Sequence, residues 1–111
     1  MNPEIPPDVC LVKPWEPVGN SGEGFVRELQ NEMSPEHILY GVPVVAVACR
    51  IDNDDVLFAT ADPSKPLALV HLVWQGREFR AAWPWTAIYQ SWQEWIDHCL
   101  LPTHLDYRGD G

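Results

Sequence analysis

The sequence predicts an α+β domain in which a small antiparallel sheet is packed against two helices. Residues 44–74 alternate apolar, β-rich runs with short turns containing Asp, Asn, Pro and Ser, a pattern typical of a β-meander. Two further segments, 21–33 and 91–101, carry apolar residues at helical spacing. Because strands that follow one another in the chain usually pair, we expect three or four strands in consecutive order.

The chain of 111 residues is long enough for one hydrophobic core. Five prolines fall within its first 17 residues: Pro3, Pro6, Pro7, Pro14 and Pro17. They predict a Pro-rich extended arm over residues 1–20, lying along an edge of the sheet. An edge strand is the alternative, limited by the prolines to residues 8–13. The single α+β domain then spans residues 21–102, and residues 103–111 are expected to form a flexible polar tail.

The first helix is expected over residues 21–33, with Asn20 or Ser21 as its N-cap. Its apolar stripe is followed by Ser34-Pro35, which ends it, and its charged side chains, Glu28 and Glu32 among them, are expected to face outward. Strands are expected over 44–50, 56–60 and 67–74. They are apolar on both faces, so both faces of the sheet should be at least partly covered. A hairpin at 77–80 and a short fourth strand at 85–89 complete the prediction.

The second helix has the clearest start signal in the chain. Ser91 and Glu94 are three residues apart, the spacing of a capping box. An apolar stripe at helical spacing follows, made of Trp92, Trp95, Ile96, Cys99 and Leu100. Pro102 is expected to end this helix.

The net charge of −9 comes from 16 acidic and 7 basic side chains. Such a surface repels phosphate, which argues against nucleic-acid or anionic-membrane binding and is compatible with a basic protein partner. Solubility is the alternative reason for the charge. Three widely spaced cysteines without a CxxC pair fit a reducing cytoplasm. No run of about 18 apolar residues is present, and we expect a soluble, cytoplasmic monomer or homodimer.

No catalytic residue, metal site or cofactor is predicted. His71 would need an acid or nucleophile within hydrogen-bonding reach to act as a general base, with Asp54, Asp55 and Thr60 as the candidates. A structural histidine with one hydrogen-bond partner is the alternative. The run of residues 52–55 lacks the glycine and the final glutamate of a calcium loop and is interpreted as a turn. The residues Asp97, His98 and His104 do not converge on a helix, which argues against zinc.

Two groups of residues are candidates for binding. The first is the acidic turn, with Asp52, Asp54 and Asp55, which would suit a basic partner. The second consists of Trp74, Trp83 and Trp85, which lie in loop-like sequence where an exposed aromatic residue often serves recognition. Burial of these indoles in the core is the alternative. Trp92 and Trp95 belong to the helical stripe and are expected in the core.

The segments Glu36–Gly41, Asp54–Phe58 and Val70–Trp74, followed by Trp83-Pro84 and Ile88-Tyr89, resemble a group of small bacterial proteins with no established activity. Members of that group carry a His-x-Leu-x-Gly segment, an Asp-Asp-Val-Leu-Phe strand, a Val-His-Leu-Thr-Trp strand and a Trp-Pro before a closing helix. Here Val73 replaces the threonine of that pattern. The resemblance covers about residues 34–100 and implies a bacterial origin and a shared fold. It also allows Asp55 and His71 to be structural partners on neighbouring strands.

The leading hypothesis is therefore a non-enzymatic, acidic protein-interaction domain of the bacterial cytoplasm, an immunity- or adaptor-type binder of a basic protein. The alternatives are a small-molecule or peptide binder that uses a Trp-lined pocket and a small hydrolase-like enzyme centred on His71.

Overall fold

A computed structural model describes residues 5–6, 9–72 and 85–109. Its core is one antiparallel sheet whose strands are ordered as in the sequence. The strands are β1 (Trp15–Pro17), β2 (Val44–Arg50), β3 (Asp55–Thr60), β4 (Leu67–His71) and β5 (Thr86–Tyr89). The predicted α+β class and consecutive strand order are confirmed. The sheet has five strands, so the prediction of three or four strands is wrong.

The additional strand is β1, which pairs with the last three residues of β2. It forms at residues 15–17, whereas the sequence limited an edge strand to residues 8–13. The pairing includes Pro17 opposite Ala48, and a proline without a backbone N–H is tolerated on an edge strand. The predicted hairpin at 77–80 lies outside the described residues.

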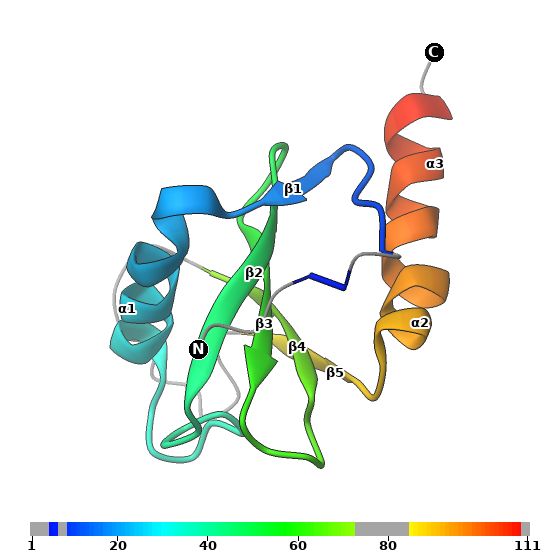
Figure 1. Ribbon diagram of the computed structural model, residues 1–111. Helices are drawn as coiled ribbons and strands as arrows, with labels where there is room; N and C mark the ends of the chain where they lie inside the picture. The colour runs from blue at the N-terminus through cyan, green and yellow to red at the C-terminus, as the bar shows by residue number, and fades with distance from the viewer. Residues whose placement is uncertain (1–4, 7–8, 73–84, 110–111) are drawn as a thin grey trace.

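Helices cover both faces of the sheet, as the apolar strands predicted. The helix α1 (Gly22–Glu32) follows a short 3₁₀ turn, η1 (Gly19–Ser21), and packs on one face. A C-terminal helical segment made of α2 (Trp92–Trp95), the π-helix η2 (Ile96–Leu100) and α3 (Leu101–Gly109) stands on the other side of the sheet in Figure 1. The predicted helix over 21–33 is confirmed to within a residue at each end.

Alternate residues of the strands face two separate apolar clusters. Under α1, Val56 and Phe58 of β3 pack with Leu29 of the helix. On the opposite face, Leu57 packs with Trp95, and Ile5, Leu11 and Val12 contribute partly buried side chains there. This alternation follows from the period of two along a β-strand.

The prediction that Pro102 ends the second helix is wrong, because Pro102 lies in the first turn of α3. The π-helix just before it makes this possible. The N–H of Leu101 donates to the carbonyl of Ile96, five residues earlier, so the helix widens where the proline offers no N–H. The Thr103 hydroxyl then donates to the carbonyls of Cys99 and Leu100, at 2.7 and 3.0 Å.

Two contacts fasten the segment around β1 to α3. The indole Nε1 of Trp15 donates to the Thr103 hydroxyl at 2.8 Å, and His104 Nδ1 lies 2.6 Å from the carbonyl oxygen of Lys13. Trp15 is 1% exposed and meets Trp95 edge to face, with ring centroids 5.2 Å apart. The interaction between the two ends of the chain is therefore both apolar and hydrogen-bonded.

Candidate functional site

A row of five side chains crosses one end of the sheet: Trp15, Arg50, Asp55, His71 and Trp85. Trp15 is opposite Arg50 in the β1–β2 register, and Asp55 is opposite His71 in the β3–β4 register. The row continues to Trp85, whose carbonyl accepts the His71 N–H at 3.0 Å. Directly opposed residues of antiparallel strands point to the same face. The row therefore lies on the face that the C-terminal helices cover.

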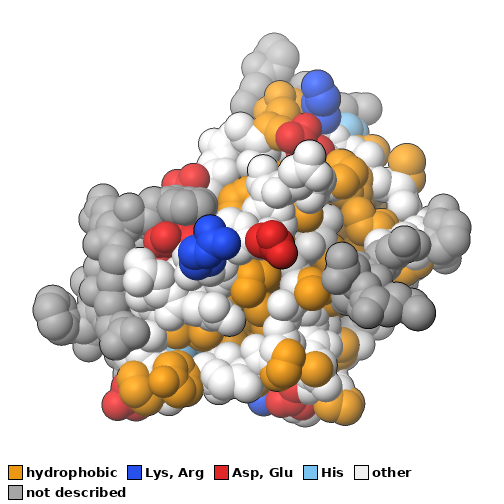
Figure 2. Space-filling view, turned by 60° about the vertical axis from the view of Figure 1, so that its left-hand side comes forward, with side chains coloured by type: hydrophobic (Ala, Val, Ile, Leu, Met, Phe, Trp, Pro, Cys, Tyr) orange, Lys and Arg blue, Asp and Glu red, His pale blue; other side chains and the backbone are white. Residues whose placement is uncertain are grey.

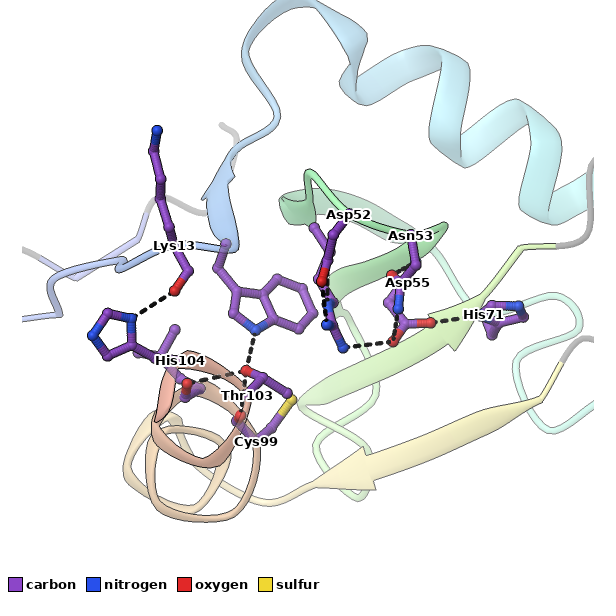
Figure 3. Close-up of polar contacts among 11 residues, drawn as sticks. Lys13, Asp52, Asn53, Asp55, His71, Cys99, Thr103 and His104 are labelled. Carbon is purple, nitrogen blue, oxygen red and sulfur yellow. Dashed lines mark hydrogen bonds and ion pairs between the residues drawn. The ribbon is translucent and has the colours of Figure 1, made fainter. Parts of the chain in front are cut away.

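Asp55 is the centre of the polar contacts in this row (Figure 3). Its Oδ1 lies 2.6 Å from His71 Nδ1, and its Oδ2 lies 3.8 Å from Nη1 of Arg50. The Arg50 guanidinium also donates twice to Asp52, at 2.8 and 2.7 Å. This bidentate bond lowers the pKa of the Asp52 carboxyl and raises that of Arg50. The Asp55 N–H donates to the Asn53 side chain at 2.9 Å, which forms the predicted turn.

The structure thus brings together Asp55 and His71, the acid and the imidazole that the sequence allowed as cross-strand partners. With Nδ1–H donating to Asp55, a neutral His71 keeps Nε2 as an acceptor. The side chain of His71 is 45% exposed, and that of Asp55 is 15% exposed. Thr60, another candidate partner, is at the opposite end of β3, where its hydroxyl contacts the turn at residues 62–65.

Among the described residues, Asp55 accounts for the hydrogen bonds found for the His71 side chain, and none of these bonds joins His71 to a nucleophile. The nearby thiol of Cys99 does not supply one. Burial raises its pKa to about 11, so the thiol is protonated at neutral pH. The contact between Asp55 and His71 is thus a cross-strand pair of β3 and β4.

The three aspartates of the turn have different surroundings. The Asp52 carboxylate accepts hydrogen bonds from Arg50, and the Asp55 carboxylate contacts His71. Asp54 is exposed, and its backbone carbonyl accepts the Leu72 N–H at 3.2 Å. All four residues 51–54 are exposed. The charge of the turn is therefore partly neutralised at its base and open to solvent at its tip.

The tryptophans divide between core and surface. Trp85 is 52% exposed, while Trp74 and Trp83 lie outside the described residues. Trp95 is fully buried, and Trp92 packs against the same cluster, as the helical stripe predicted. The described part of the chain thus leaves Trp85 as the exposed member of the predicted binding group.

His37 is a structural residue that the sequence analysis did not single out. It is 4% exposed. Its Nδ1 accepts the Leu39 N–H at 3.0 Å, and its Nε2 lies 3.0 Å from the Thr86 hydroxyl. Its Nδ1 thus closes a local turn, and its Nε2 links the segment before β2 to β5. Its signal in the sequence is the His-x-Leu-x-Gly segment.

The expected outward position of Glu32 is wrong, because its side chain is completely buried. Glu32 is one turn from Glu28 on α1, and the two carboxyl groups share a hydrogen bond. This bond, burial and the neighbouring negative charge together raise the pKa of Glu28 to about 7. Glu28 is accordingly half protonated near neutral pH.

Neither a metal site nor a membrane span is found in the described part of the chain. It holds no cluster of three or more His, Cys, Asp or Glu side chains suited to a metal ion. Within the same residues, no helix combines the length and apolar character needed to cross a bilayer. Asp97 and His98 are exposed, and Asp97 accepts a hydrogen bond from Gln93 at 2.9 Å.

A groove with a volume of about 770 Å³ lies between α1 and the free part of the β2 edge. It is lined by Val44, Val45, Ala46 and Val47 of β2, by Val26 of α1 and by Ile5, together with the turn at residues 17–20 and polar side chains of α1. Figure 2 shows the side of the molecule that carries α1, where hydrophobic side chains reach the surface among isolated charged ones. The groove includes neither His71 nor Asp55.

No protein-family model matches this chain, and comparison with curated proteins and with solved structures also finds no match.

Proposed function

We propose that this chain is a non-enzymatic, acidic protein-interaction domain of the bacterial cytoplasm that binds a basic partner, in the manner of an immunity or adaptor protein. The observation that supports this proposal is the surface at the end of the sheet, where the exposed tip of the acidic turn and Trp85 flank His71. Carboxylates attract a lysine or arginine, and an exposed indole offers its π-face to the same cation.

The charges of the described residues also favour a basic partner. Two of the basic side chains, Arg50 and Lys65, are already paired with Asp52 and Asp62, at 2.7 and 2.8 Å. Their charge is therefore compensated within the molecule. The net charge of −9 leaves an excess of carboxylates to steer a basic protein toward this surface.

The test is light scattering after size-exclusion chromatography, on protein isolated from its native host at low and high salt. We expect a complex at low salt that dissociates at high salt, because exposed charges are screened within about 10 Å at 0.1 M salt. The double variant Asp54→Asn, Trp85→Ala should lose the complex. Asp97→Asn removes an exposed carboxylate elsewhere and should retain it. A monomer at both salt concentrations would overturn the proposal.

A further inference from the structure

The edge of β2 is only partly covered by β1. The β1 strand pairs with Ala48, Cys49 and Arg50 and ends at Pro17, where the chain turns toward α1. No described strand pairs with the remaining residues of β2, Val44–Val47, on this edge. These four residues form one wall of the groove described above.

The backbone groups available on this edge follow from the ladder on the other side of β2. The Ala61 N–H donates to the Pro43 carbonyl at 2.9 Å, and Val44 is opposite Thr60 in the next pair. Because paired and unpaired residues alternate along an antiparallel ladder, Val44 and Ala46 turn their N–H and C=O groups away from β3. Among the described residues, no backbone hydrogen bond is found for these outward groups, so both residues present β-sheet hydrogen-bonding groups to the groove.

We infer that this groove binds an extended, lysine- or arginine-bearing segment of the partner protein, which adds to β2 as a strand in line with β1. Such strand addition takes its affinity from main-chain hydrogen bonds and its specificity from pockets for alternate side chains. Four residues of an added strand would span about 13 Å along Val44–Val47. The inference rests on the proposed function, because it specifies how part of the basic partner is held.

The walls of the groove suit one strand. Val26 of α1 lies on one face of the sheet edge, and Ile5 belongs to the apolar cluster of the opposite face. Side chains of an added strand alternate between these two faces. Apolar residues of the segment can therefore contact either wall while its backbone pairs with β2.

Charge selects the partner segment over a second copy of this chain. Two copies would each carry a net charge of −9 and would repel one another, whereas a basic segment is attracted. Glu23 and Arg27 are the charged side chains among the groove lining residues, and they offset one another. The groove itself thus recognises backbone and apolar side chains, and the charge of the whole domain increases the rate of encounter.

The probe is a fluorescein-labelled nine-residue peptide of alternating lysine and valine, followed by anisotropy at 0.15 M salt. Val44→Pro removes the outward N–H without removing a bond to β3, and should weaken binding at least tenfold. Val44→Thr keeps the N–H and the β-branched shape and should bind within twofold of the original. As a second matched pair, Val26→Gln should weaken binding, whereas Ile38→Gln, at an exposed apolar residue outside the groove, should not. Urea midpoints verify that each variant is folded.

The groove inference fails if the peptide does not bind, or if Val44→Pro and Val26→Gln bind it as well as their controls do. Binding that is abolished by salt but insensitive to both groove variants would overturn the groove and leave the basic-partner proposal intact. A dimer that exists without peptide and dissociates in Val44→Pro would show that the occupant is a second copy, which also overturns the inference.

Discussion

The Glu28–Glu32 pair contributes a stability that decreases as the pH rises, which is the opposite of the usual effect of a carboxyl group. In the folded state the pKa of Glu28 is raised from 4.5 to about 7. A group with a raised pKa binds its proton more tightly when the protein is folded. Its contribution to stability is complete below about pH 4.5 and is lost as pH rises through about 7.

The magnitude follows from the two pKa values. Since one pKa unit is worth about 1.4 kcal/mol, the difference between 4.5 and about 7 corresponds to about 3 kcal/mol. Glu28 is only partly buried, and solvent screening reduces this value. We therefore expect the free energy of unfolding to fall by about 1.5 kcal/mol from this pair between pH 4.5 and pH 8.

The perturbation is Glu28→Gln, which removes the titrating group but keeps a side chain that can donate a hydrogen bond to Glu32. At pH 8 this variant should be more stable than the original protein by about 1.5 kcal/mol, and at pH 4.5 the two should be nearly equal. Urea unfolding at intervals of half a pH unit measures the difference. Subtracting the two profiles removes the contributions of the histidines and other carboxylates.

The matched control is Glu23→Gln on the same helix. Glu23 is exposed in the first turn of α1, where a negative charge interacts favourably with the helix dipole. Its neutralisation should cost about 0.5 kcal/mol at pH 8, the opposite sign to Glu28→Gln. Identical pH profiles for the original protein and Glu28→Gln would refute the reasoning.

Two further pairs of variants test the backbone and the link between the chain ends. Gly41→Ala should cost about 1 kcal/mol because Gly41 has φ +79°, whereas Gly24→Ala, in helical backbone with open space around it, should gain about 0.5–1 kcal/mol. Thr103→Val should cost about 1–2 kcal/mol because the buried Trp15 indole loses its acceptor, and Thr103→Ser should cost less; urea unfolding measures all four. A stabilising Gly41→Ala would contradict the argument from the positive φ of Gly41. A neutral Thr103→Val would contradict the stabilising role of the Trp15–Thr103 hydrogen bond.

Regular features of the fold could be predicted from the sequence because they depend on local patterns. The apolar runs predicted β2 and β3 to within a residue at each end, and Ser91 with Glu94 predicted the start of the last helix. Here the Glu94 N–H donates to Ser91 Oγ at 3.0 Å, while the Glu94 carboxylate accepts from the Gln90 N–H. The second bond is thus shifted by one residue from the capping box.

The features that could not be predicted depend on contacts between distant segments. Glu32 is charged, like the exposed residues of α1, so the helical pattern predicted that its side chain faces solvent. The packing of the helix buries this side chain instead. A proline inside a helical pattern normally ends the helix. Here the helix continues through Pro102 because a π-turn precedes the proline and the Thr103 hydroxyl donates to the carbonyl of Cys99. For the candidate site, the pairing of Asp55 with His71 was foreseeable because one strand register relates them. The contacts of Arg50 were not foreseeable, because they also involve β1 and the turn after β2.

The edge of β2 beyond β1 is left open where β1 ends, and a register shift in β2 limits aggregation at this edge. The strand β1 ends at Pro17, where the chain turns into η1, so no described strand pairs with Val44–Val47 on this edge. Such an edge invites aggregation unless it is blocked by bulges, prolines or charges. Here the register with β3 shifts between Ala46 and Ala48, which breaks the regularity that a long incoming sheet needs. A short strand can pair with Val44 and Ala46 before this shift, so the edge can remain available to one segment while disfavouring continuous sheet growth.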